Sequence, residues 1–435
     1  LDALRESDAT SNFFSNSGRY PLTAQGRINL YQIFAGLVRQ IVGPEGRVGI
    51  VVPSGIATDY YSQDYFSTLI EKQELVSLYD FENKRELFRG VHREQRFCLL
   101  TSAGANTPVS AAEFAFFLHS TDELADPQRC FKLSREDIAR INPNTGTVPV
   151  FRHRHDAELT RRIYQRTPVL IDQGRQHNPW QVAFRQGLFN MTSDSHLFKT
   201  RAELLEEGFA SESNRFTRED QAYFPLYEGK LTQIYDHRFA TFGSLPEATE
   251  QKGTPRPTSE LEHRCSDFVV TPRFWISDSA LESVLPGGRP REFWLTFHDV
   301  ANPNNERTFI GTLCPPIGLG NTLPAVVSRE ESLSTVSTCL LLANWNSFVF
   351  DYVSRRKIGS RHFNFYVVEQ LPVLPPDRYT PSLLDLIVPR VVELTYTAWD
   401  LQPFSRKALN EAGGETWARW FADSPVHTSP PPDWA

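Results

Sequence analysis

The feature that most constrains this chain is an alternation of helical and strand-like patterns in its first hundred residues. Residues 30–42 (LYQIFAGLVRQIV) place apolar side chains at helical spacing and stop at Gly43-Pro44, a pair that ends helices. Residues 47–53 (RVGIVVP) then form a short β-branched run closed by a proline, which predicts one buried strand. Helix followed by apolar strand is typical of a layered α/β sheet.

The alternation continues with a second helix and two further strands. A helical pattern covers residues 65–73, and apolar runs at 75–81 (LVSLYDF) and 96–101 (RFCLLT) predict the strands. Only a loop, residues 82–95, separates these two strands. A parallel crossover normally needs a helix, so we expect this pair to be antiparallel.

Composition excludes several classes of protein. The chain has 435 residues, of which 40% are hydrophobic and 22% charged, as in soluble globular proteins of two or three domains. It contains no run of 18 or more apolar residues, and residues 1–16 lack the apolar core of a signal peptide. We therefore expect a cytoplasmic protein with no membrane partner.

Cysteines and net charge narrow the possible partners. The five cysteines are widely spaced, form no CxxC pair, and are predicted to be free thiols in a reducing compartment rather than metal ligands. The net charge of -7 argues against a uniformly basic nucleic-acid binder. Local basic patches facing phosphate remain compatible with that charge.

Beyond the first strands the pattern becomes less regular. A turn cluster at residues 142–146 (NPNTG) predicts a boundary near 150, and the chain from 151 to 375 is aromatic-rich and poorly periodic. Residues 247–260 suit an exposed loop, whereas 340–353 and 382–399 suit helices. We expect a mixed α+β region after the α/β sheet, then C-terminal helices. The predicted divisions are 1–105, a connector at 106–150, 151–375, and 376–435.

Two basic clusters are candidates for contact with DNA phosphates. The first contains Arg152 and Arg154, with Arg161 and Arg162 nearby. The second spans residues 355–362 and is the stronger candidate, because Gly359 permits close approach of a backbone. Its cationic residues are Arg355, Arg356, Lys357, Arg361 and His362. A solvated helix face is the alternative for either cluster.

Other residues carry open alternatives. Pro53 and Ser54 follow a strand at the carboxyl edge of the sheet, where α/β folds bind ligands, but the proline can equally just end the strand. Residues 305–307 (NER) suit base reading or, as we favour, an internal network. Asp194 and His196 suggest a buried polar pair. Residues 228–230 (EGK) match half of a nuclease signature, with Asp194 or Asp220 as a poorly spaced partner.

An ordered series of short motifs resembles one family. Residues 26–31 (GRINLY), 50–53 (IVVP), 87–91 (LFRGV) and 96–101 (RFCLLT) resemble the later motifs of gamma-class N6-adenine DNA methyltransferases. Later segments resemble the large methylase proteins of Type IIG-like restriction-modification and phage-defence systems. These are 178–180 (NPW), 191–198 (MTSDSHLF), 225–230 (PLYEGK), 235–239 (YDHRF), 305–308 (NERT), 344–348 (NWNSF) and 364–366 (NFY). The similarity covers nearly the whole chain.

The resemblance implies a fold and an activity. Residues 1–105 would be the second half of a Rossmann-like methyltransferase sheet, and 151–375 a target-recognition domain. The complete enzyme would transfer a methyl group from S-adenosylmethionine to the N6 atom of a flipped adenine in double-stranded DNA. Phe88 matches the position of an aromatic residue that stacks on that base, although it also suits a core position.

This sequence departs from the family pattern in two respects. The glycine-rich loop that binds S-adenosylmethionine and the Asn-Pro-Pro-aromatic tetrapeptide of catalysis do not occur in it. We therefore expect the chain alone to be inactive, with the cofactor bound mainly by an N-terminal half in the same polypeptide or a partner chain. The alternative hypothesis is a catalytically silent DNA-binding or assembly subunit of a phage-defence complex.

Overall fold

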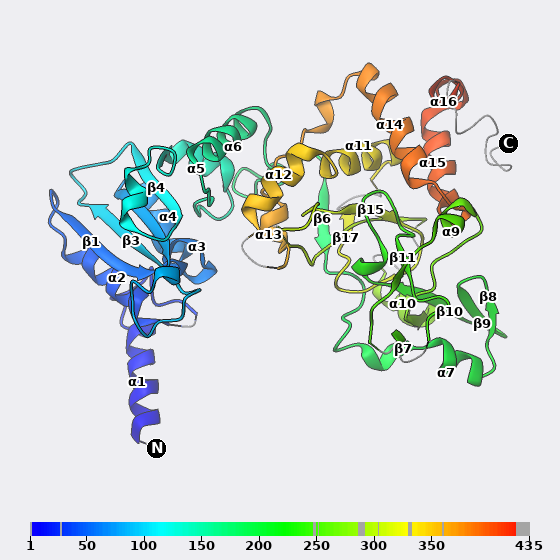
Figure 1. Ribbon diagram of the computed structural model, residues 1–435, viewed down its shortest axis with the longest axis horizontal. Coiled ribbons are helices and arrows are strands. Elements are labelled where there is room, and N and C mark those ends of the chain that lie inside the picture. The colour runs from blue at the N-terminus through cyan, green and yellow to red at the C-terminus, as the bar shows by residue number, and fades with distance from the viewer. Residues whose placement is uncertain are drawn as a thin grey trace. The chain divides into compact units, whose positions relative to one another are not determined.

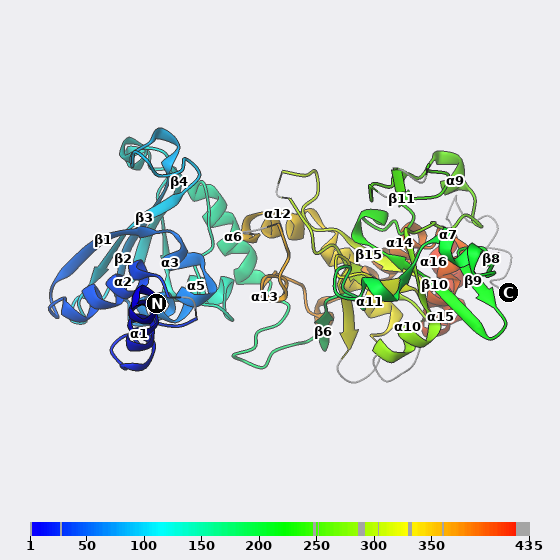
Figure 2. The ribbon, with the colours of Figure 1, turned by 90° about the horizontal axis from the view of Figure 1, so that it is seen from below.

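The computed structural model describes residues 2–26, 28–246, 249–250, 252–285, 292–302, 304–328, 333–358 and 361–422. The chain divides into two compact units, Leu1–His177 and Asn178–Ala435 (Figures 1 and 2). Both units combine helices with β-sheets, so the chain is a mixed α/β protein. Within the described ranges, no helix is long and apolar enough to cross a membrane.

The first unit is built on a five-stranded sheet of order β1-β3-β2-β4-β5. Strand β3 runs antiparallel to both β1 and β2, β4 runs parallel to β2, and β5 runs antiparallel to β4. Strands β1, β2 and β4 therefore point the same way and end at one edge. Their bounds are β1 Arg47–Pro53, β2 Leu75–Glu82, β3 Arg96–Ala103, β4 Ala111–Leu118 and β5 Phe131–Ser134.

The sequence prediction for this sheet is confirmed at its centre. The two strands joined by the loop 82–95 are antiparallel, with Leu78 opposite Leu100. The segment 106–150, expected to be a connector, instead supplies β4 and β5, because the apolar run in β4 pairs in parallel with β2. The first unit accordingly extends to His177 rather than ending near 105 or 150.

Helices cover this sheet and form its core. Their bounds are α1 Asp2–Asn16, α2 Leu30–Ile41, α3 Gly55–Thr58, α4 Gln63–Glu71, α5 Arg135–Ile141 and α6 Arg154–Arg166. Helix α2 begins at a capping box in which Asn29 and Gln32 bond reciprocally. The rings of Phe114, Phe116 and Phe131 stack at the centre of the core, which fixes strands β4 and β5 against each other.

In its described residues, the second unit contains three further sheets, of six, four and two strands. One has the order β7-β13-β10-β9-β8 with β16 beside β10, one has the order β15-β14-β17-β6, and one pairs β11 with β12. Their bounds are β6 Val182–Arg185, β7 Phe198–Lys199, β8 Ala210–Glu212, β9 Arg215–Arg218, β10 Gln221–Tyr227, β11 Ala240–Thr241, β12 Arg256–Pro257, β13 Phe274–Ser277, β14 Trp294–Phe297, β15 Gly311–Cys314, β16 Gly318–Leu319 and β17 Ala325–Ser328.

Helices of the second unit lie mostly toward its C-terminus (Figure 1). They are α7 Arg201–Glu206, α9 Glu260–Arg264, α10 Asp278–Val284, α11 Thr335–Trp345, α12 Phe348–Lys357, α13 Phe365–Val368, α14 Pro381–Thr395, α15 Gln402–Ala412 and α16 Gly414–Phe421. The single helix expected over 340–353 is two helices. The chain breaks because Asn346 bonds both the N–H and the carbonyl of Gly311, and Ser347 caps α12.

Two buried basic side chains join the C-terminal helices to the rest of the second unit. His237 has no exposed surface and bonds Asp400 at 2.8 Å, in the turn that precedes α15. Arg238 is equally buried and donates to four backbone carbonyls, including that of Thr397. These bonds place 376–422 in one unit with 178–375, where the sequence predicted a separate segment.

Some sequence predictions fall outside the described residues. The exposed loop expected at 247–260 includes Glu247, Ala248 and Gln251, which are not described, while its described part carries β12. The glycine of the second basic cluster, Gly359, and the tail from residue 423 also lie outside the described ranges.

Candidate site at the carboxyl edge of the N-terminal sheet

Polar groups from four neighbouring strands meet where β1, β2 and β4 end. Ser54 follows β1, Asp80 lies near the end of β2, Arg96 begins the antiparallel β3, and Phe117 lies near the end of β4. Carboxyl ends of parallel strands are the edge at which open α/β sheets bind ligands. Ser54 was singled out from the sequence, whereas Asp80, Arg96 and Phe117 were not.

Asp80 is the centre of this group. It has no exposed surface, and its carboxylate accepts the hydroxyl of Ser54, the Arg96 guanidinium at 2.6 Å and the backbone N–H of Phe117 at 3.1 Å. A buried carboxylate is tolerated only when a cation and further donors surround it, and all three are present here. The group therefore fixes the ends of four strands relative to one another.

The backbone at Phe117 departs from the strand to make this contact. Its φ is +56°, in the left-handed region that a side chain like phenylalanine rarely adopts. The β2–β4 register shifts between Tyr79 and Phe81, opposite this residue. Such bulges redirect a strand at its rim, and here the N–H turns toward Asp80. Strain held by a surrounding network is common at functional sites.

Two guanidinium groups lie over the ring of Phe117. The Arg96 carbon Cζ is 4.7 Å from the ring centroid and that of Arg152 is 4.5 Å from it. Both lie within the range of cation–π attraction. Arg152, predicted from the sequence as a phosphate contact, is exposed and stands beside the candidate site.

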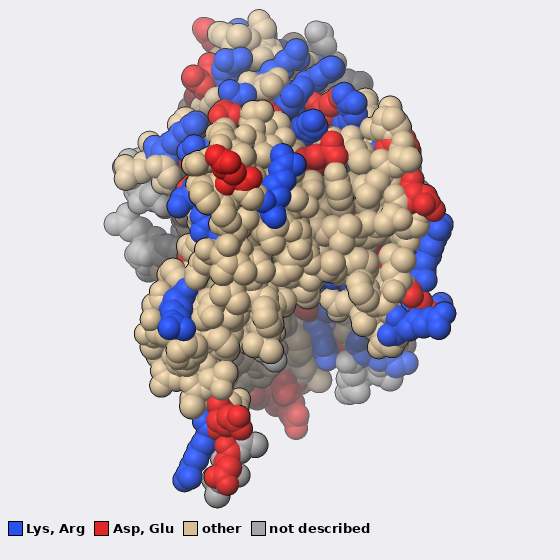
Figure 3. Space-filling view, turned by 90° about the vertical axis from the view of Figure 1, so that its left-hand side faces the viewer, with Lys and Arg blue, Asp and Glu red and all other residues tan. Residues whose placement is uncertain are grey.

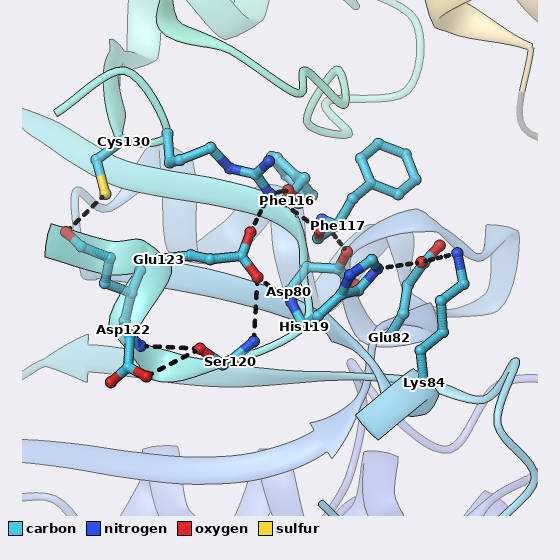
Figure 4. A network of polar contacts seen from close by, with 12 residues as sticks. Asp80, Glu82, Lys84, Phe116, Phe117, His119, Ser120, Asp122, Glu123 and Cys130 are labelled. Carbon is cyan, nitrogen blue, oxygen red and sulfur yellow. Dashed lines mark hydrogen bonds and ion pairs between the residues drawn. The ribbon is translucent and has the colours of Figure 1, made fainter. Parts of the chain in front are cut away.

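A second layer of contacts holds the chain after β4 (Figure 4). Arg129 donates to the carbonyls of Phe116 and Phe117 and pairs with Glu123 at 3.3 Å. His119 bonds Glu82 at 2.9 Å, and Lys84 pairs with the same carboxylate at 2.6 Å. Burial raises the pKa of Glu82, but the bonds from Lys84 and His119 outweigh it, so the pKa is lowered. Glu82 thus remains ionised and can hold both partners.

Phe88 lies in the loop between β2 and β3 and is 44% exposed. Its ring contacts Phe97 edge to face at 4.8 Å, and Phe97 in turn stacks on the buried Phe81. The side chain of Asn83 bonds both the N–H and the carbonyl of Phe88 at 2.9 Å. The ring is therefore held at a fixed place with part of its surface open.

The remaining residues of the first basic cluster lie along α6. Arg154 pairs with Glu158 at 2.9 Å one turn further, while Arg161 and Arg162 are exposed. An i,i+4 pair of this kind on an exposed face is weak and leaves the guanidinium accessible. Arg152 and Arg154 therefore both face solvent, although Arg154 shares its charge with a carboxylate.

The second basic cluster is engaged mostly within the chain. Arg355 donates to the carbonyls of Asn305 and Glu306 at 2.9 Å and pairs with Asp351 at 3.0 Å. Arg356 lies 3.6 Å from the ring centroid of Tyr352. The loop at 305–307 is thus fixed through its backbone carbonyls. The main role of Arg355 is therefore to hold this loop rather than to contact a ligand.

Lys357 and His362 also have internal partners. The Lys357 ammonium donates to the carbonyl of Gln370 at 2.6 Å, and burial lowers its pKa well below the ordinary value. His362 bonds Asp299 at 2.6 Å but remains largely exposed, as does Arg361. Of this cluster, Arg361 and His362 present the most surface to a ligand.

The nuclease and buried-pair hypotheses find little support. Lys230 pairs with Glu228 at 2.9 Å and donates to the carbonyl of Gly253. In the described part of the chain, no three His, Cys, Asp or Glu side chains gather as a metal site. The expected buried pair of Asp194 and His196 is wrong, because His196 is exposed and Asp194 bonds the N–H of Asn190 in its own turn.

Comparison with known proteins gives no match by sequence and several by structure. No protein-family model and no curated protein matches the chain. The solved structure of the type IIG restriction endonuclease BpuSI is similar over 90% of this chain and 47% of that one, with 13% identity and a TM-score of 0.32. The type IIL restriction-modification enzyme MmeI in complex with DNA is similar over 90% and 50%, with 13% identity and a TM-score of 0.35.

A third similar structure is also a complex with DNA. The DrdV–DNA complex is similar over 74% of this chain and 33% of that chain, with 9% identity and a TM-score of 0.29. The chain spans about half the length of the first two proteins and a third of the last.

Proposed function

We propose that this chain is part of a site-specific DNA adenine-N6 methyltransferase of a restriction-modification or phage-defence system. It would supply DNA recognition and support for base flipping, while the methyl donor is bound mainly by a segment outside this chain. Its partners would be double-stranded DNA and the N-terminal half of the catalytic domain, and further defence-system subunits are compatible with the same arrangement.

The observation that carries the proposal is the order and direction of the first strands. Strands β1 and β2 are parallel, each follows a helix, and the loop-connected β3 lies antiparallel between them. This arrangement supports the proposal that they are the closing strands of a Rossmann-like methyltransferase sheet, as the motif resemblance implies. The same strands bring Ser54, Asp80 and Arg96 to the ligand-binding edge.

An open sheet edge supports the proposal that the N-terminal half of the catalytic domain covers this sheet. Strand β1 ends the strand order, and Val51 on it is 52% exposed. Helix α2, which packs against β1, exposes Leu30, Phe34 and Ile41 by 61%, 56% and 71%. Figure 3 faces the side where β1 and α2 lie and shows a broad area of uncharged residues. Exposed edges and apolar faces of this size call for a covering element.

The residues present do not make a donor pocket by themselves. The oxygens of Asp80 are occupied by Ser54, Arg96 and the Phe117 N–H, and the sequence has no glycine-rich loop. S-adenosylmethionine therefore does not fit the described residues of this chain alone. The segment that covers β1 would complete the pocket for the methyl donor.

For Phe88 we propose base stacking. Its ring rests on Phe97, is fixed through Asn83, and keeps 44% of its surface exposed. A rigid, half-exposed aromatic ring suits a base that has left the duplex. Arg152, on the same edge of the sheet, would contact the phosphate backbone of that DNA.

One observation favours the silent DNA-binding subunit as the second candidate. The Asn-Pro-Pro-aromatic tetrapeptide is absent from the sequence, and the polar groups at the carboxyl edge are bonded to one another. A subunit that only recognises DNA would have this property. It would use the same basic residues and need no cofactor.

Calorimetric titration of S-adenosylmethionine separates the two candidates. The titration is made with this chain alone and with the full product of its gene, each at the same concentration. Binding by the gene product and none by this chain would support the methyltransferase. If neither binds, while both bind duplex DNA, the methyltransferase proposal is wrong and the silent subunit takes its place.

A further inference from the structure

Helix α12 begins with an aromatic ring in solvent. Phe348 is 81% exposed and Val349 beside it is 54% exposed, although the residues behind them are core. The helix itself is well fixed, since Ser347 caps it through the N–H of Phe350 at 3.2 Å. A large apolar side chain held in solvent at a rigid helix start indicates contact with another molecule.

One face of this ring is covered by a guanidinium group. The Cζ atom of Arg307 lies 4.2 Å from the Phe348 ring centroid, within cation–π range. With that face covered, an exposed fraction of 81% means that the opposite face is open. The pair therefore offers a flat aromatic surface with a positive charge behind it.

The loop that carries Arg307 is clamped to α12. Asp351 accepts the N–H groups of Thr308 at 2.7 Å and Phe309 at 2.9 Å. Arg355, from the next turn, donates to the two carbonyls before Arg307, at 2.9 Å each. Because both clamps come from the same helix as Phe348, the guanidinium and the ring hold one geometry before any ligand arrives.

The charge around this surface is positive. Arg356 stacks over Tyr352 one turn along α12, and Arg361 lies exposed beyond the helix. Asp351 is paired with Arg355 and Asp299 with His362, while Glu306, next to Arg307, is the exposed carboxylate on the same loop. Exposed aromatic rings among cations complement a polyanion with stackable bases.

We propose that Phe348 is a wedge that stacks on a base at a step of duplex DNA, with Arg307 and Arg356 facing the neighbouring phosphates. Apolar side chains inserted between base pairs unstack and bend DNA in this way. The proposal rests on the DNA partner of the proposed function and adds the residue that deforms the duplex. Arg355 is then a positioning residue rather than a phosphate contact.

Fluorescence anisotropy with the full chain and labelled 30-base-pair duplexes tests the wedge. One duplex is fully paired, and the other carries a single central mismatch, which lowers the cost of unstacking. Phe348→Ala should weaken binding to both about tenfold and abolish the preference for the mismatch. The slope of affinity against salt should not change, because no charge is removed.

Three controls make the outcomes distinct. Val349→Ala removes a neighbouring exposed side chain and should bind like the wild type, and Arg307→Met should lower the salt slope by about one. Equal binding of Phe348→Ala and wild type to both duplexes would overturn the wedge and leave DNA recognition standing. Absence of wild-type binding at 50 mM salt would overturn the DNA partner itself.

Discussion

The hydroxyl of Ser54, after β1, donates its hydrogen to Asp80, a carboxylate without exposed surface near the end of β2. Because Arg96 and the Phe117 N–H fill the other oxygen, the serine hydrogen has one fixed direction. Ser54 is itself buried, so this bond belongs to the packed edge of the sheet.

Removing Asp80 should cost more than removing its partners. Asp80→Ala leaves Arg96 and two further donors without an acceptor, so we expect a loss of about 3 kcal/mol in the free energy of unfolding. Ser54→Ala should cost about 1 kcal/mol, because it deletes one hydrogen bond and leaves the ion pair. Urea denaturation measures both. Equal effects of the two variants would contradict the role given to Asp80.

The buried Arg238 gives a second stability prediction. Arg238→Met removes the hydrogen bonds to four backbone carbonyls, including the bond that joins Thr397 to the rest of the second unit. We expect a loss of about 3–5 kcal/mol and exposure of the C-terminal helices to protease. Arg264→Met is the matched control. The Arg264 side chain is 73% exposed and pairs with Glu260 on the same helix, so the stability of this variant should stay within about 0.5 kcal/mol of the wild type.

The sequence predicted local elements well and long-range partnerships poorly. Strand β1 and helix α2 follow from a β-branched run and an amphipathic pattern, and both have the expected bounds within one residue. Strand β4 was missed as part of the sheet, because its parallel pairing with β2 depends on residues more than thirty positions earlier. The break before α12 was missed for the same reason, since Asn346 bonds the distant Gly311.

The candidate site could be predicted only in part. Pro53 and Ser54 are marked by the end of a strand, which a sequence shows directly. Asp80 is a lone carboxylate in the apolar run LVSLYDF, but it was not singled out from the sequence, because its partners come from three other strands. Likewise the sequence of residues 355–362 predicts a positively charged segment. Only the structure shows that Arg355 donates to the carbonyls of Asn305 and Glu306 within the chain.

Stability should fall in mild acid because of His298. Its Nε2 atom bonds the Thr232 hydroxyl at 2.8 Å, and burial lowers its pKa from 6.5 to about 4. In the unfolded chain His298 binds a proton below about pH 6.5, whereas in the folded chain it binds one only near pH 4. The contribution of the neutral His298 to the free energy of unfolding is complete above pH 6.5. It is lost as the pH falls toward 4, by up to about 1.4 kcal/mol per pH unit.

The control for this titration is His298→Gln, which keeps a polar side chain that does not titrate. Denaturation is measured for both proteins between pH 4 and 8. The difference between them should be constant above pH 6.5 and shrink below it. A difference that grows as the pH falls would contradict a neutral buried imidazole.

The two basic clusters should respond differently to substitution. Arg152→Ala removes an exposed guanidinium whose contact is the Phe117 ring, so DNA affinity should fall, the salt slope should drop by about one and stability should barely change. Arg355→Ala removes bonds to two carbonyls and Asp351, so stability should fall by about 2 kcal/mol. Fluorescence anisotropy and urea denaturation are measured on both variants. A loss of stability in Arg152→Ala together with a loss of DNA affinity alone in Arg355→Ala would contradict these roles.

Phe88 offers the most direct test of methyl transfer in the complete enzyme. Phe88→Ala keeps the loop, because Asn83 holds the backbone of residue 88 rather than its ring. Methylation should fall at least tenfold and the fluorescence of a 2-aminopurine at the target position should change, since the extruded base loses its stacking partner. Phe88→Tyr retains an aromatic face and should restore most activity. Unchanged methylation and base extrusion in Phe88→Ala would leave the ring with only its packing on Phe97.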